Sequence, residues 1–147
     1  PQLRAATAEW HATGAGSHRS HQLALLGHAV AAGGDTAEGL ELLDQSAAQL
    51  ALTGERFLEA ETHRLRGEVL RLAGRPAEAD AAFRAAIAVA RRQQDRSLEL
   101  RAAISLCRLD PPPADARSQL AAVAGWFTEG FDTPDFQAAR AVLDEPA

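Results

Sequence analysis

Apolar side chains recur along the chain at steps of three and four residues, the period of a helix with one buried face. No segment alternates polar and apolar residues as a half-buried strand does. Forty residues separate Gly27 from Gly67, and an apolar stripe, a glycine-centred turn and a second apolar stripe surround each glycine. Such self-similarity is typical of repeat proteins, so the sequence predicts helical hairpins in tandem.

The pattern predicts eight helices, at residues 3–12, 18–32, 37–52, 55–73, 76–93, 97–109, 114–127 and 134–144. Asp35 or Thr36 and Thr133 are typical N-caps, and Pro76 stands where a first-turn proline belongs. The hairpins are expected at 17–53, 55–93 and 97–127. The helix at 3–12 would complete an earlier hairpin, and the helix at 134–144 would cap the last one. We therefore expect a single all-α domain over residues 1–147.

Small residues are expected to let the two helices of a hairpin approach closely. Gly67 is predicted to face Ala79 and Phe83, with the phenyl ring filling the space that the glycine leaves. A bulky residue at position 67 would then push the helices apart.

The composition argues against some partners. A net charge of -5 and a pI near 5.5 are not typical of a nucleic-acid-binding surface, which needs a basic face. No apolar stretch approaches the roughly 20 residues of a membrane helix. All basic residues are arginine and there is no lysine, which indicates a GC-rich bacterial genome. The single cysteine, Cys107, fits a reducing cytoplasm, and its place in a predicted helix indicates a packed thiol. The chain, which has no methionine, looks like a segment of a longer protein.

Residues 65–91, LRGEVLRLAGRPAEADAAFRAAIAVAR, resemble a tetratricopeptide repeat. The matching small and large positions are Gly67, Leu70, Gly74, Ala79, Phe83 and Ala86. In the first copy Gly39 takes the place of the usual small alanine, and Leu43 that of the aromatic residue. The resemblance implies a right-handed superhelix of antiparallel helix hairpins.

From about residue 40 onward the chain is also similar to the C-terminal repeat region of large bacterial signalling ATPases. The most specific match is the closing stretch GWFTEGFDTPD, residues 125–135. In that family an adenylate cyclase-type or DNA-binding domain commonly precedes a STAND-type ATPase module, and the repeats follow. The resemblance implies a non-catalytic interaction and regulatory domain, with catalysis elsewhere in the full-length protein.

In tetratricopeptide-like arrays the first helix of each hairpin lines a groove, and helical periodicity then selects the groove residues. The candidate partner-binding residues are His21, His28, Glu61, Arg64, Glu68, Arg71, Arg101 and Arg108. The arginines could bind a peptide carboxylate or an acidic motif. The alternative that we favour is that the residues at 61, 64, 68 and 71 pair among themselves along their helix.

No other constellation predicts chemistry. The chain lacks a phosphate-binding glycine loop, a nucleophile elbow and a histidine partner for Cys107, so we expect no catalytic residue and no cofactor. His18, His21 and His28 share one predicted helix but have no accompanying cysteine or carboxylate set, so we expect no metal site.

Two further questions stay open. Trp126, Phe127, Phe131 and Phe136 lie within eleven residues and are expected to cap the open end of the last hairpin, or alternatively to form an exposed docking patch. The expected partner is a protein or peptide, or another domain of the same chain. The alternatives are a small-molecule-sensing repeat and a structural oligomerisation module, and the oligomeric state is not predicted.

Overall fold

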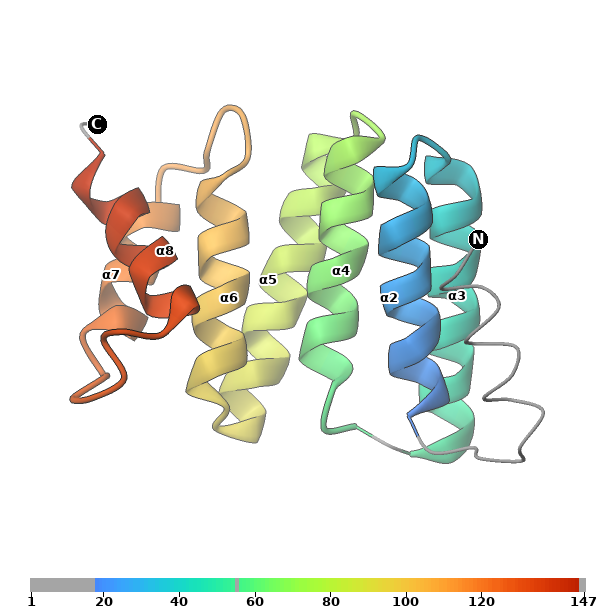
Figure 1. Cartoon of the computed structure of the whole chain (residues 1–147), viewed down its shortest axis with the longest axis horizontal. Helices are drawn as coiled ribbons and strands as arrows, with labels where there is room; N and C mark the ends of the chain where they lie inside the picture. The colour runs from blue at the N-terminus through green and yellow to red at the C-terminus, as the bar shows by residue number, and fades with distance from the viewer. Residues whose placement is uncertain (1–17, 55, 146–147) are drawn as a thin grey trace.

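The computed structural model describes residues 18–54 and 56–145, and every regular element in these ranges is an α-helix. The helices are α2 (Arg19–Ala32), α3 (Thr36–Thr53), α4 (Glu59–Leu72), α5 (Pro76–Gln93), α6 (Arg96–Cys107), α7 (Ala116–Ala124) and α8 (Pro134–Asp144) (Figure 1). The predicted all-α class is confirmed for this part of the chain. The predicted helix at 3–12 lies outside the described residues.

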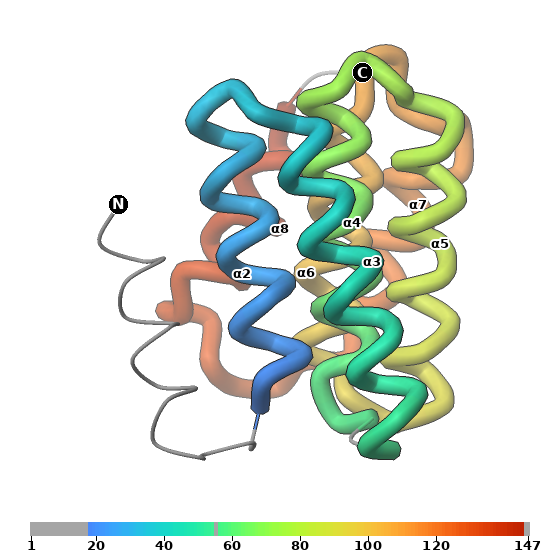
Figure 2. Tube along the Cα trace, turned by 90° about the vertical axis from the view of Figure 1, so that its right-hand side faces the viewer, coloured from blue at the N-terminus to red at the C-terminus, as the bar shows by residue number. Residues whose placement is uncertain are grey.

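The helices form a row of antiparallel hairpins, α2–α3, α4–α5 and α6–α7, with α8 at the end (Figure 1). The first helix of each hairpin (α2, α4 and α6) and α8 make up the front layer, and α3, α5 and α7 make up the back layer. Each front helix contacts the next front helix and the preceding back helix, whereas no close backbone contact joins α3, α5 and α7 to one another. Figure 2 looks along this row from the end formed by α2 and α3. We call the surface formed by α2, α4, α6 and α8 the front face.

Glycine sets the helix spacing inside the first two hairpins. A Cβ atom added at Gly67 would overlap the ring of Phe83, which confirms the predicted contact between these two residues. A Cβ at Gly27 would lie 2.7 Å from the carbonyl oxygen of Gly39, and a Cβ at Gly39 would lie 2.7 Å from that of Gly27. Both hairpins are therefore too tight for a side chain at these positions.

The apolar core is distributed along the row. The largest cluster of buried side chains extends from Leu70 of α4 to Ala139 of α8. A second cluster joins α2, α3 and α4 around Leu43, and a third lies where Ala60 and Leu98 meet α5. The described helices are thus not wrapped around one central core.

Local sequence signals explain most helix ends. The side chain of Asp35 accepts a hydrogen bond from the Glu38 amide (2.9 Å) and caps α3, and Thr133 caps α8. Pro76 opens α5 as predicted. The observed bounds of α5 and α8 equal the predicted ones, 76–93 and 134–144.

Three predicted helices are too long. Helix α4 begins at Glu59 instead of residue 55, because residues 56–58 form a turn closed by a hydrogen bond from the Glu59 amide to Arg56. Helix α6 ends at Cys107 instead of 109, and α7 covers Ala116–Ala124 instead of 114–127. At the end of α7 the amides of Trp126 and Phe127 bond to carbonyls three residues back, which is a tightened final turn.

The aromatic cluster caps the last hairpin only in part. Phe136 is buried at 9% exposure, and Phe127 packs against the same core. The Phe136 ring lies 4.9 Å from that of Phe131 and 5.9 Å from that of Phe127. Trp126 and Phe131 remain 60% and 47% exposed. Two of the four rings thus cover the core, and two face solvent.

Candidate functional site

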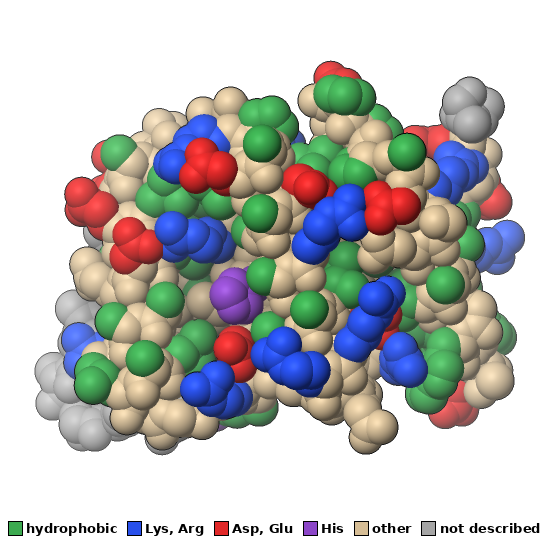
Figure 3. Space-filling model, turned by 180° about the vertical axis from the view of Figure 1, so that it is seen from behind, with side chains coloured by type: hydrophobic (Ala, Val, Ile, Leu, Met, Phe, Trp, Pro, Cys, Tyr) green, Lys and Arg blue, Asp and Glu red, His purple; other side chains and the backbone are tan. Residues whose placement is uncertain are grey.

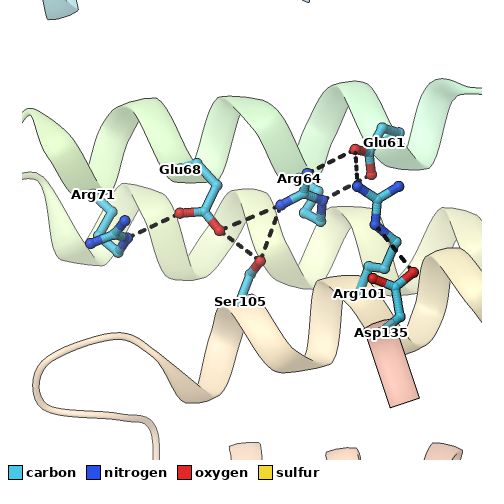
Figure 4. Close-up of polar contacts among 7 residues, drawn as sticks. All are labelled: Glu61, Arg64, Glu68, Arg71, Arg101, Ser105 and Asp135. Carbon is cyan, nitrogen blue, oxygen red and sulfur yellow. Dashed lines mark hydrogen bonds and ion pairs between the residues drawn. The ribbon is translucent and has the colours of Figure 1, made fainter. Parts of the chain in front are cut away.

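A network of charged side chains joins α4, α6 and α8 on the front face (Figure 4). Arg64 donates to both carboxylate oxygens of Glu61, at 2.7 and 2.8 Å. Glu68 accepts from Arg71 at 3.0 Å and from the Ser105 hydroxyl at 2.7 Å. These contacts confirm the alternative that we favoured, in which the charges along α4 pair with one another.

The network also links the second hairpin to the third. Arg101 of α6 lies 3.0 Å from the same Glu61 carboxylate that binds Arg64. Its Nε atom is 3.8 Å from the Asp135 carboxylate of α8, which is an ion pair but not a hydrogen bond. Glu61 thus receives two guanidinium groups from two different hairpins, and these contacts fix how α4 and α6 sit against each other.

Most of this network is buried, unlike a surface ion pair. Glu61 is only 3% exposed, and Arg64 and Glu68 are largely buried. Burial alone would lower the pKa of Arg64, but the hydrogen bonds and charge of Glu61, together with the charges of Glu68 and Asp135, outweigh it and raise that pKa. Arg64 therefore stays charged, and its charge is largely neutralised within the protein.

A hollow of about 190 Å³ opens beside the network. It is lined by Arg64, Arg101, Ile104, Ser105, Arg108, Asp135 and Ala138, and we call it the cationic hollow. Arg108 is exposed, and its side chain makes no hydrogen bond or ion pair with any described residue. The hollow thus combines two neutralised arginines with one available guanidinium.

The eight predicted groove residues therefore divide into three groups. Five belong to the network described above: Glu61, Arg64, Glu68, Arg71 and Arg101. Arg108 lies in the cationic hollow without an ion-pair partner among the described residues. The two histidines of α2 are half-buried, and neither His21 nor His28 lines the cationic hollow.

His21 lies near enough to the network to sense its charges. Burial lowers the pKa of His21, the charge of Glu61 raises it, and those of His18 and Arg101 lower it. Its Nδ1 atom is buried and has no hydrogen-bond partner among the described residues. His18 precedes α2 with a left-handed backbone (φ 62°), and its ring packs edge-on against Phe57 at 5.2 Å. His18 therefore does not share a helix with His21 as predicted.

A second opening lies between α3 and α4 and measures about 390 Å³. Leu43, Ala47 and Leu50 are among its apolar lining residues, and His63 and Arg66 of α4 are among its polar ones. Burial lowers the pKa of His63, with Glu59 opposing this effect and Arg66 and Arg92 reinforcing it. We call this opening the α3–α4 crevice.

The repeat explains why the crevice exists. Forty residues beyond Ala47 stands Ile87, which is buried at 3% exposure where α5 meets α6. The smaller Ala47 lines the open α3–α4 joint, whereas the larger Ile87 belongs to the apolar core that α5 shares with α6. Sequence analysis missed the crevice, although comparing Ala47 with Ile87 would have indicated it.

Other candidate chemistry is sparse among the described residues. Cys107 is half-buried, and burial raises the pKa of its thiol, which fits a packed side chain. Within residues 18–54 and 56–145, no three His, Cys, Asp or Glu side chains are placed to share a metal ion. Sequence analysis also missed Ser105 and Asp135, whose contacts with the network depend on how the helices pack.

Comparison with protein-family models, curated proteins and solved structures found no match to this chain. The resemblance to tetratricopeptide repeats and signalling ATPases therefore remains a hypothesis from the sequence. In the part of the chain that the structure describes, no helix has both the length and the apolar character to span a bilayer.

Proposed function

We propose that this chain is a non-catalytic interaction and regulatory segment of a larger bacterial signal-transduction protein, acting in the cytoplasm. In this proposal the hairpins form a right-handed, tetratricopeptide-like superhelix. Its front face binds an acidic segment of a protein partner, or of another domain of the same chain, and so biases an output domain. The oligomeric state is not part of the proposal.

One observation carries this function: Arg108 stands exposed in the cationic hollow, with no ion-pair partner among the described residues. Guanidinium groups bind carboxylates through paired hydrogen bonds, and a free peptide carboxylate or an acidic side chain offers that geometry. Arg101 lines the same hollow, and its guanidinium has further N–H groups besides the one that faces Glu61. The single hydroxyl hydrogen of Ser105 is already donated to Glu68. The open row of hairpins supports the proposal, since it leaves one side of α4, α6 and α8 accessible to an extended segment.

Selection from a library of displayed random peptides tests this function on the intact chain. We expect the selected peptides to carry a free carboxyl terminus or acidic side chains, and to lose most of their affinity for Arg108→Ala. Arg140→Ala is the matched control, because Arg140 is an exposed arginine of α8 outside the hollow. Failure to select any peptide, or equal binding to both variants, would contradict the proposal.

The α3–α4 crevice favours a second candidate function, a small-molecule sensor. Its volume lies within the range of known ligand pockets, and apolar side chains line it beside His63 and two arginines, Arg56 and Arg66. Both arginines already pair with carboxylates, Glu59 at 3.4 Å and Asp44 at 2.5 Å. This candidate predicts that small apolar carboxylic acids raise the melting temperature, and that Ala47→Ile, which fills the crevice, abolishes the effect. An unchanged effect in that variant would exclude the crevice as the site.

A further inference from the structure

The exposed Trp126 ring already holds one cation. The guanidinium carbon of Arg96 lies 5.4 Å from the centre of the ring, which is within the range of a cation–π contact. Tryptophan is the aromatic side chain that binds cations most strongly. At 60% exposure the ring keeps much of its surface open to solvent.

A hollow of about 380 Å³ lies beside Trp126, where α6 and α8 meet the loop that follows α7. Leu100, Trp126 and Phe127 supply its apolar surface, and Glu129 and Asp135 supply two carboxylates. None of its lining residues is basic. We call it the acidic hollow. Aromatic walls beside carboxylates that make no hydrogen bond to an internal cation are complementary to a cation carried on an apolar stem.

The two carboxylates are available for binding. Glu129 is exposed and makes no hydrogen bond or ion pair with a described residue. Asp135 is also exposed, and its contact with Arg101 is 3.8 Å long, beyond hydrogen-bond distance. A second cation can therefore approach both groups without breaking a strong internal pair.

We propose that the acidic hollow binds an arginine or lysine side chain of the protein segment that lies on the front face. Asp135 lines both hollows, so the two are neighbours along α8. A segment that places an acidic group beside Arg108 would pass Asp135 and could place a basic residue next to Trp126. The partner thus carries an acidic and a basic group near each other. This inference rests on the proposed function.

The indole N–H signal of Trp126 in the NMR spectrum of the intact chain provides the test. A Trp126→Phe variant identifies the signal, since Trp10 is the other tryptophan. Titration with N-acetylarginine amide is expected to move this signal in a saturable way. N-acetylcitrulline amide, which has nearly the same shape but no charge, is expected to bind at least about fivefold more weakly. Equal binding of both probes, or no movement of the signal, would overturn the proposal.

Charge removal inside and outside the hollow supplies the matched comparison. Glu129→Gln is expected to lower the affinity for N-acetylarginine amide about two- to fivefold, which is the range of an exposed ion pair. Asp132→Asn removes a charge from the same loop but outside the hollow, and is expected to leave affinity unchanged. Equal effects of both variants would overturn the proposal. If N-acetylarginine amide does not bind while selected peptides still require Arg108, only the acidic hollow is rejected as a binding site. If N-acetylarginine amide binds but no selected peptide requires Arg108, the proposed function is rejected.

Discussion

At the scale of single residues, a missing side chain decides how closely α4 and α5 approach. Phe83 is fully buried, and its ring occupies the space where a Cβ at Gly67 would lie. In the first hairpin, a similarly close approach of α2 and α3 depends on two glycines, Gly27 and Gly39, and on Leu43, which is smaller than Phe83. Each of these two hairpins therefore balances a small residue on one helix against the bulk of the other.

Replacing Gly67 tests this balance. We expect Gly67→Leu to lower the free energy of unfolding by about 1–3 kcal/mol, because the new side chain overlaps the Phe83 ring. Urea denaturation followed by circular dichroism measures the change. In a double variant with Phe83→Ala, which removes the ring, the loss in free energy of unfolding should be smaller than the sum of the losses in the two single variants. Strict additivity would contradict the packing that we describe.

The buried ion-pair network makes a second prediction. We expect Glu61→Gln to lower the free energy of unfolding by about 3 kcal/mol, because Arg64 and Arg101 would lose the charge that neutralises them. The matched control is Glu78→Gln, which removes an equally short pair with Arg75 that lies fully in solvent. This control should change stability little. Equal effects in urea denaturation would show that burial does not strengthen the network.

The sequence predicted part of this network and could not predict the rest. Pairing of Arg64 with Glu61 and Glu68 follows from helical spacing alone. The contact between Arg101 and Glu61 depends on the register of α6 against α4, which no local pattern encodes. For the same reason Arg101 was expected to be free for a ligand, whereas it is already paired. Arg108 is the arginine of this set that stays available among the described residues.

At the scale of helices, boundaries were predictable where a side chain marks them. Pro76 and the N-cap Thr133 set the starts of α5 and α8 to the residue. Leu58, which precedes α4, makes no side-chain cap hydrogen bond, so no capping residue marks the start of the helix at Glu59. The pattern of apolar residues continues through the turns that flank α7, which explains why its predicted length was too great.

Filling the crevice between α3 and α4 is expected to change the stability of the protein. We expect Ala47→Ile to raise the free energy of unfolding by about 0.5–1 kcal/mol, because isoleucine fills the crevice as Ile87 fills the next joint. Ala48→Ile is the control, since Ala48 is exposed like Ala47 but does not line the crevice. It should be slightly destabilising, because isoleucine favours a helix less than alanine does. Thermal unfolding of both variants measures the difference, and a destabilised Ala47→Ile would contradict the comparison of the two joints.

The terminal helix α8 makes a further prediction. We expect Phe136→Ala to lower the free energy of unfolding by about 3–5 kcal/mol, because its ring closes the large core cluster at the end of the row. Phe131→Ala removes an equal side chain that is half-exposed and should cost much less. Chemical denaturation of the two variants decides whether α8 is a structural cap. Similar losses would mean that the core does not depend on Phe136.

At the scale of the whole molecule, neighbouring charges of opposite sign lie on both faces, and the front face also carries charges without a close internal partner. Over the face formed by the back layer, basic and acidic side chains lie next to one another (Figure 3). One example is Arg84 of α5, which pairs with Asp115 at 2.8 Å. On the front face two hollows of opposite character lie side by side, with Arg108 in one and Glu129 in the other. This arrangement favours the front face as the interaction surface.

Mapping of a bound acidic peptide onto the chain by NMR chemical shifts tests the central claim most directly. The peptide is one selected for binding to the intact protein. We predict that the changes concentrate on the parts of α4, α6 and α8 around Arg108 and Ser105, and disappear in Arg108→Ala. Changes centred on α3, α5 and α7, with no dependence on Arg108, would contradict the account.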